Sequence, residues 1–189
     1  MTEQLNVVAV SGGAGFPSTT RVLSDLLTQA VSAAAEEQGI QARVQTQEVR
    51  DTATDVADAT VLGLPSATLD EALRAVEQAD LVVATSPVFR GSYAGIVKAF
   101  WDLVDPVVMR GKPVLLGATG GSVRHQLMID QAFRPLFSYF GSLVLPTGVY
   151  AEVEDFEVAN IPSQALAERV ARAGREAVRL TERARALLP

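Results

Sequence analysis

Residues 5–21 read LNVVAVSGGAGFPSTTR, an apolar run that passes through glycines and hydroxyl side chains into a helix-forming stretch. The run from Leu5 to Val10 is typical of a strand buried on both faces. The apolar residues after the loop recur at helical spacing and predict an amphipathic helix. They are Val22, Leu23, Leu26, Leu27, Ala30, Val31 and Ala34. A strand that leads directly into a helix is the first unit of an α/β fold.

The loop between this strand and this helix is suited to hold an anion. Unpaired backbone amides cluster at a helix N-terminus, where the helix dipole is also positive. We therefore expect a phosphate to meet the hydroxyls of Ser18, Thr19 and Thr20 together with Arg21. Replacing Arg21 by alanine should then weaken phosphate binding by about 1.5–3 kcal/mol, the range for a charged hydrogen bond.

Other interpretations of the loop stay open at this point. A serine or threonine before a helix is also a routine N-cap, so the loop alone does not separate capping from phosphate binding. The lysine of a GxxxxGK[ST] triphosphate loop is absent. A GxGxxG dinucleotide fingerprint begins at Gly13 and Gly15, but Ser18 stands where its third glycine belongs. Both nucleotide-loop interpretations are therefore disfavoured.

The amino-acid composition excludes several kinds of catalytic site. The length of 189 residues fits one domain over residues 1–189, and 48% hydrophobic with 20% charged residues is typical of a globular chain. The chain has no cysteine, which excludes disulfides, thiolate nucleophiles and sulfur-ligated metals. His125 is the single histidine and leaves little for a metal site or a catalytic triad. We therefore expect no catalytic side chain and no metal, with the chemistry carried by a bound cofactor.

The charge distribution argues against nucleic acid and membrane partners. Of the 22 acidic and 16 basic residues, the first 160 positions hold 19 and 10, so a polyanion would be repelled by most of the surface. The start, MTEQLN, has no basic patch and no long apolar region, and no apolar run approaches the roughly 20 residues that a bilayer requires. These features predict a cytoplasmic protein.

Two further units repeat the first one. Residues 80–86 and 112–118 each predict a buried strand, and the loops after them, residues 87–93 and 119–122, lead into helices. Strands that alternate with helices imply parallel, right-handed βαβ units, in which ligands bind beyond the carboxyl ends of the strands. We expect the three loops to converge on one site.

The remaining segments complete the expected order of elements. We expect an edge strand at 41–48, a mixed loop with one short helical turn at 51–66, a helix at 69–79, an interrupted strand at 142–151 and a closing helix after Pro162. Residues 123–140 predict one helix, which is apolar enough for a subunit interface and should bend or bulge at Pro135.

A flat aromatic group with a phosphate tail fits such loops, and FMN is the natural candidate. Its phosphate would lie at Ser11 and at residues 18–21, with its ring between the second and third loops. The helix expected after Ser122 would direct its positive end toward the pyrimidine edge of the ring. Hydride transfer needs little more from a protein than stacking room and favourable dipoles.

Two stretches carry a resemblance to a known family. They are TSPVFRGSYAGIVKAFWDL at residues 85–103 and GKPVLLGATGGSVRHQLMIDQAFRPLF at residues 111–137. From Val7 to about Ala151 the chain resembles the NADPH-dependent FMN reductases, especially members that supply reduced flavin to two-component monooxygenases of the alkanesulfonate type. The resemblance implies an α/β, flavodoxin-like three-layer sandwich with a five-stranded parallel sheet in the order 2-1-3-4-5. It also implies dimers or tetramers that use NADPH or NADH.

The resemblance assigns cofactor-binding positions residue by residue. The phosphate loop corresponds to Ser11, Ser18, Thr20 and Arg21; the loop beside the ring to Pro87, Val88, Phe89 and Tyr93; and the loop at its other edge to Thr119, Gly120, Gly121 and Ser122. Thr19 and Arg90 are cofactor-binding candidates from their own chemistry and their places in the first and second loops. Some relatives have a tyrosine near Gln131 that stacks across a subunit interface, and its absence here leaves open whether FMN is retained or passed on.

Several of these residues also have a purely structural interpretation. Tyr93 and Trp101 suit a core or an interface, and Trp101 lies on the apolar stripe of its helix. Arg90 and Arg124 suit either a phosphate or the surface, and His125 suits a local hydrogen bond at a helix start.

The function expected from the sequence is an NAD(P)H-dependent FMN reductase that supplies reduced flavin to a monooxygenase. An FMN-retaining quinone or azo reductase is the second interpretation. A non-enzymatic, flavodoxin-like electron carrier is the third.

Overall fold

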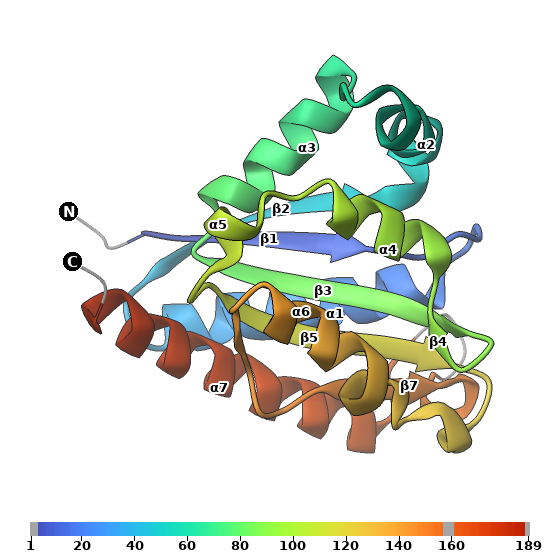
Figure 1. Cartoon of the computed structure of the whole chain (residues 1–189). Coiled ribbons are helices and arrows are strands. Elements are labelled where there is room, and N and C mark those ends of the chain that lie inside the picture. The colour runs from blue at the N-terminus through green and yellow to red at the C-terminus, as the bar shows by residue number, and fades with distance from the viewer. Residues whose placement is uncertain (1–3, 157–160, 188–189) are drawn as a thin grey trace.

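The computed structural model describes residues 4–156 and 161–187 and builds them around one mostly parallel sheet (Figure 1). The strands lie in the order β2-β1-β3-β5-β6, with β7 also paired to β5 and β4 paired to β3. Their bounds are β1 (Gln4–Ser11), β2 (Gln41–Glu48), β3 (Leu81–Phe89), β4 (Ser92–Tyr93), β5 (Pro113–Gly120), β6 (Leu143–Val144) and β7 (Val149–Glu152).

The expected strand order is confirmed, although the fifth strand of that order is split. Residues 142–151 form two short pieces, β6 and β7, and both pair in parallel with β5. Pro146 lies between the pieces and has no N–H to offer a neighbouring strand. With β4 added as an antiparallel hairpin on β3, the sheet counts seven strands, so the expected five was an approximation.

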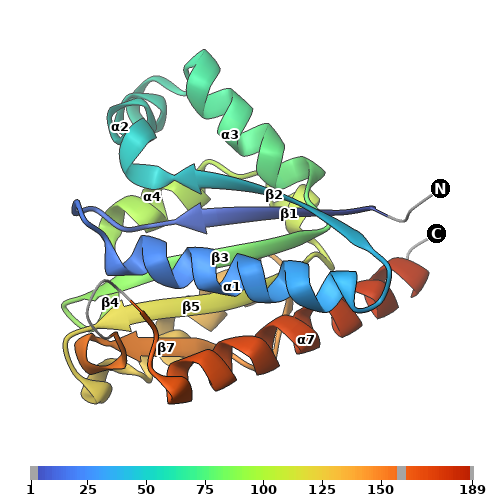
Figure 2. The same ribbon diagram turned by 180° about the vertical axis from the view of Figure 1, so that it is seen from behind.

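Helices cover both faces of the sheet and complete the three layers. One face carries α1 (Thr19–Glu36) and α7 (Gln164–Leu187), which lie side by side in Figure 2. The other face carries α2 (Ala53–Leu62), α3 (Ala67–Gln78), α4 (Gly95–Asp102), α5 (Pro106–Met109) and α6 (Arg134–Tyr139). Within the described ranges, no helix combines the length and apolarity needed to cross a bilayer.

The alternation of side chains along β1 explains why the core has two halves. Val8 and Val10 belong to the cluster beneath α3, α4 and α6, while Val7 and Ala9 belong to the cluster beneath α1 and α7. Successive side chains of a strand point to opposite faces, so a strand covered on both sides must be apolar throughout. This is the pattern that the apolar run of residues 5–10 predicts.

Residues 51–66 are more regular than expected. A short turn at Val49–Thr52 leads into the ten-residue helix α2, which ends at Gly63 with a positive φ of 76°. The helix buries just Val56 and Ala59, whereas Val61 and Leu62 face outward. Because apolar side chains occur on both its inner and outer sides, its helical period is weak and the sequence pattern did not reveal it.

Residues 123–140 do not form the single helix that the sequence predicts. The segment consists of a three-residue 3₁₀ turn at Val123–His125, a π-helical turn at Ile129–Phe133 and the short α6. The expected bulge is present, since the π turn ends at Phe133, two residues before Pro135, whose missing N–H and bulky ring disfavour regular α-helix there. The expectation that a long helix after Ser122 points its positive end at a ligand was wrong, because only the 3₁₀ turn begins there.

Candidate functional site

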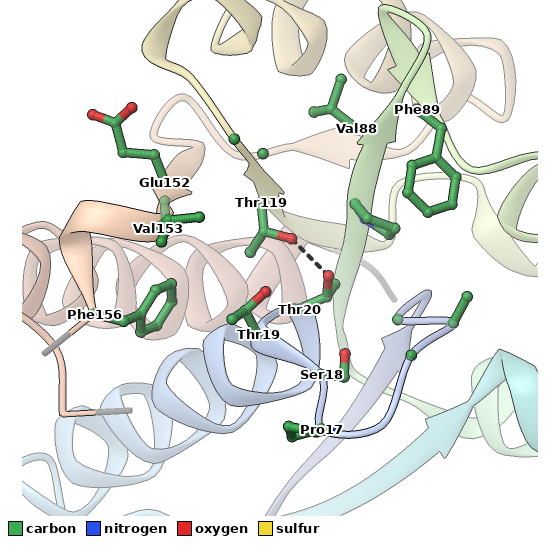
Figure 3. Close-up of a pocket in the computed structure, with 17 residues that line it drawn as sticks. Pro17, Ser18, Thr19, Thr20, Val88, Phe89, Thr119, Glu152, Val153 and Phe156 are labelled. Carbon is green, nitrogen blue, oxygen red and sulfur yellow. Dashed lines mark hydrogen bonds between the residues drawn. The ribbon is translucent and has the colours of Figure 1, made fainter. Parts of the chain in front are cut away.

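A pocket of about 320 Å³ opens at the carboxyl ends of the parallel strands (Figure 3). Its lining comes from the loop after β1 with the start of α1, and from the carboxyl ends of β3, β5 and β7 with residues just after β5 and β7. The convergence of three loops that the sequence predicts is therefore confirmed, and the end of β7 joins them. Nine predicted residues line the pocket: Ser18, Thr19, Thr20, Pro87, Val88, Phe89, Thr119, Gly120 and Gly121.

The first loop folds tightly onto the start of α1. Ser18 is the N-cap, and its hydroxyl accepts a hydrogen bond of 3.2 Å from the backbone N–H of Arg21. A Cβ on Gly13 would lie 2.0 Å from the Ser18 Oγ atom, so a side chain at that position would displace the capping hydroxyl. The interpretation of Ser18 as a helix cap is confirmed, and its contact with a phosphate stays a prediction.

A buried hydrogen bond ties the first loop to the third. The hydroxyl oxygens of Thr20 and Thr119 lie 2.6 Å apart, and the two residues are 3% and 5% exposed (Figure 3). Two hydroxyls that share one hydrogen bond retain a second hydrogen, which is available to a ligand in the pocket. The pair therefore fixes the width of the pocket and supplies a donor at its floor.

Arg21 lies differently from what the sequence suggests. Its Nε atom donates to Asp25 Oδ1 at 2.8 Å, and its Nη1 atom donates to Glu48 Oε1 at 2.5 Å. The hydrogen bond to Asp25 is the main influence that raises the pKa of Arg21. The residue does not line the pocket. The structure thus shows a guanidinium held by two carboxylates, and a role in phosphate binding stays a prediction.

Arg50 braces the first loop, a role that sequence reasoning missed. Its Nη1 atom donates to the carbonyl oxygen of Gly15 at 2.6 Å, and its Nη2 atom forms an ion pair with Glu48 Oε2 at 2.7 Å. The guanidinium also lies 5.5 Å from the ring centroid of Phe16. These contacts join the end of β2 to the loop after β1, and no sequence spacing indicates such a pairing.

Besides Arg21 and Arg90, three predicted residues lie outside the lining of this pocket. Ser11 is fully buried at the end of β1, and its Oγ atom has no hydrogen-bond partner among the described residues. Tyr93 packs against Phe133 with ring centroids 5.4 Å apart, which supports its interpretation as a core residue. Ser122 supports the third loop, since its carbonyl oxygen accepts a hydrogen bond of 2.6 Å from the hydroxyl of Tyr150.

The wall formed by Ala151, Glu152, Val153 and Phe156 was not predicted. These residues lie at the carboxyl end of β7 and just after it, so the rule that placed the other loops at this edge also applies to them. Glu152 has its side chain directed away from Thr19 and Thr20 (Figure 3). The rest of this wall is apolar.

A second pocket of about 750 Å³ adjoins the first. It is lined by Val88, Phe89, Arg90, Gly91 and His125. Val88 and Phe89 line both pockets and form the wall between them. Arg90 therefore belongs to the neighbouring space, whereas Arg124 lines neither pocket.

Comparisons with known proteins agree on one family. The family described as "NADPH-dependent FMN reductase" matches residues 5–157. An "FMN reductase (NADPH)" of Pseudomonas aeruginosa PAO1 is 41% identical over 95% of this chain and 94% of its own length. The "NADH-dependent FMN reductase SfnF" of Pseudomonas fluorescens Pf0-1 is 40% identical with the same coverage. The crystal structure of an oxidoreductase from Corynebacterium diphtheriae superposes with a TM-score of 0.89 at 35% identity, over 96% of this chain and 98% of that one.

Proposed function

The chain belongs to the NADPH-dependent FMN reductase family, and we propose that it reduces FMN with a nicotinamide dinucleotide in the pocket at the carboxyl edge of its sheet. The observation that carries the proposal is the joint lining of this pocket by the start of α1 and by the carboxyl ends of β3, β5 and β7. Such an edge is where open α/β sheets bind phosphorylated ligands.

The polar end of the pocket fits a phosphate. It consists of the N-terminus of the 18-residue helix α1 together with the hydroxyls of Ser18, Thr19 and Thr20. Residues 13–20 contribute no carboxylate to the lining, so no negative charge on this loop opposes an anion. The unpartnered hydroxyl of Ser11 lies at the end of the strand that feeds this loop.

The remaining walls fit a flat ring. Val88 and Phe89 line one side of the pocket, and Val153 and Phe156 line another (Figure 3). Gly120 allows Tyr150 to pack closely against the third loop, because a Cβ there would lie 2.3 Å from the hydroxyl oxygen of Tyr150. Apolar walls with a few polar groups at one end are the usual design of a cofactor pocket.

The groups that line the pocket have separate roles in this reaction. Bound FMN supplies the hydride acceptor. The hydroxyls and amides at the start of α1 bind its phosphate, the Thr20–Thr119 pair holds two loops at a fixed separation, and the apolar walls orient the ring and displace water. No side chain of the pocket has to give or take a proton for the transfer itself.

We extend the proposal to the setting in which the protein works. Reduced FMN would pass to a flavin-dependent monooxygenase, in the cytoplasm, from a homodimer or homotetramer. Exposed apolar side chains support contact between copies: Leu127 is 53% exposed and Tyr139 is 82% exposed, and both lie between β5 and β6. Sedimentation of the purified protein would give the assembly size, and a monomer at all concentrations would contradict this part of the proposal.

Turnover with free FMN tests the function. We expect oxidation of NADPH or NADH, followed at the nicotinamide absorbance, to require added FMN and to saturate with it. Thr20→Val should raise the FMN concentration needed, because it removes a buried hydroxyl while keeping the shape of the side chain. Oxidation no faster than in the protein-free control would contradict the proposal. Turnover of quinones by protein that keeps FMN through purification would instead favour the quinone reductase interpretation.

A further inference from the structure

The turn between β3 and β4 holds an arginine in an unfavourable backbone conformation. Val88 pairs with Tyr93 and Phe89 with Ser92, so Arg90 and Gly91 form a two-residue hairpin turn. Their φ angles are 52° and 82°. A turn with two positive φ angles favours asparagine, aspartate or glycine at both positions. Arg90 is the only residue other than glycine with a positive φ in the described part of the chain.

The strain at this position raises the question of why it holds an arginine. Asparagine or glycine would form the same turn with less steric conflict, so the backbone gives no reason for an arginine. Strained residues of this kind gather at binding sites, where the side chain is needed in one place. The strained residue here lines a pocket.

The Arg90 guanidinium is also unengaged. Within residues 4–156 and 161–187 it makes no ion pair and no hydrogen bond, whereas Arg21, Arg50 and Arg134 are each held by carboxylates or carbonyl groups. It lies on the lining of the second pocket with His125, next to the Phe89 wall that this pocket shares with the proposed FMN site. A ligand that reaches the flavin from the second pocket therefore passes a free cation.

We propose that Arg90 binds a phosphate of the nicotinamide dinucleotide, which occupies the second pocket while its nicotinamide reaches the FMN site. This inference rests on the proposed function and names the residue that recognises the second substrate. A guanidinium presents paired N–H donors in a plane that matches two phosphate oxygens. The phosphate is either the pyrophosphate, present in NADH and NADPH, or the 2′-phosphate, present in NADPH alone. One relative is named for NADPH and another for NADH, so the family does not decide between the two phosphates.

Binding to FMN-free protein tests the assignment directly. Titration calorimetry with NADP⁺ and with NAD⁺ would give Kd values for the wild type and for Arg90→Asn. We expect Arg90→Asn to raise the Kd for NADP⁺ about tenfold or more, as for loss of a charged hydrogen bond. Its melting temperature should stay equal or increase, since asparagine suits the turn. Arg90→Lys should restore part of the affinity.

The matched control is Arg124→Asn, which removes the same charge from an exposed residue outside both pockets. A rise for NADP⁺ alone assigns the 2′-phosphate, and an equal rise for NAD⁺ assigns the pyrophosphate. Kd values within twofold of the wild type, or an equal rise in Arg124→Asn, would overturn the inference. Failure of the proposed function would look different, because the wild type would then bind the dinucleotide without FMN-dependent turnover.

Discussion

The guanidinium of Arg21 is divided between two carboxylates, Asp25 one turn along α1 and Glu48 at the end of β2. Both carboxylates lie outside the pocket lining, and so does Arg21. Its positive charge is therefore largely compensated before any ligand arrives. The affinity of the first loop for a phosphate should come from the amides and hydroxyls at the start of α1 instead.

Substitution of Arg21 by alanine distinguishes these sources. We expect Arg21→Ala to change the Kd for FMN by less than about threefold, the scale of a partly exposed ion pair. Quenching of FMN fluorescence on titration with protein measures that Kd. Thr20→Val is the comparison, because Thr20 lines the pocket and should show the larger loss. A rise of about tenfold or more in Arg21→Ala would show that the guanidinium leaves its carboxylates to bind the phosphate.

At the scale of elements, the packing of α7 on α1 depends on a glycine. A Cβ on Gly174 would lie 2.6 Å from the carbonyl carbon and 2.7 Å from the carbonyl oxygen of Ala30. Both contacts are with backbone, which cannot move without displacing α1. Small side chains along α7, such as Ala173 and Ala177, are fully buried and allow the same close approach.

Gly174→Ala should therefore destabilise the protein although alanine is the better helix former. Overpacking of a tight contact costs about 1–3 kcal/mol, against about 1 kcal/mol gained from helix propensity. Urea denaturation gives the free energy of unfolding. Ala167→Gly, at an exposed position of the same helix, measures the propensity contribution alone. A Gly174→Ala variant more stable than the wild type would show that the two helices separate without cost.

Lys112 closes the C-terminal end of α3. Its Nζ atom donates to the carbonyl oxygens of Val76 and Glu77, each at 2.7 Å. Burial lowers the pKa of Lys112 to about 8, although Asp80 and Glu77 oppose this shift. Between that value and the ordinary pKa of 10.5, the unfolded chain binds more protons than the folded one.

The stability of the wild type should accordingly rise with pH relative to Lys112→Met. The gain in the free energy of unfolding that comes with the lowered pKa is complete above the unfolded value of 10.5, and it is lost as the pH falls through about 8. Denaturation of both proteins at pH 7, 8, 9 and 10 compares their free energies of unfolding. A difference that stays constant, or that moves in favour of Lys112→Met as the pH rises, would contradict a lowered pKa at this site.

Elements whose apolar residues follow one clear period could be predicted from the sequence. Residues 5–10 and 80–86 are mostly apolar and became β1 and β3, and the helical stripe after residue 21 became α1. The pattern failed where neighbours decide the structure. The helix α2 buries two small side chains, and residues 123–140 are divided into turns that pack against β5, β6 and the ring of Tyr93.

At the scale of the whole molecule, the topology predicted where the site lies, but it did not predict which residues contact one another there. Parallel strands bring their carboxyl ends together, which located the pocket before any distance was known. Individual contacts required the fold itself: Arg50 reaches Gly15 from 35 positions along the chain, and Thr20 reaches Thr119 from 99. The assignment of residues 1–189 to one domain, and the binding roles of the individual pocket residues, stay predictions.

The residues that line the pocket are far apart in the sequence, so a bound ligand should stabilise the folded protein. The lining runs from Gly13 to Phe156, so a bound molecule connects segments that unfolding would separate. A ligand that binds only the folded state at 100 times its Kd stabilises it by about 2.7 kcal/mol. For a chain of this length that corresponds to a rise of about 5–11 °C in melting temperature.

We therefore expect FMN to raise the melting temperature in proportion to the logarithm of its concentration above the Kd. Differential scanning calorimetry over a series of FMN concentrations measures the rise. Riboflavin, which has the same ring without the phosphate, is the control and should give a smaller shift at equal concentration, because the hydroxyls and amides at the start of α1 would lack their ligand. Equal shifts for the two compounds would mean that the ring alone is bound and that the first loop does not hold the phosphate.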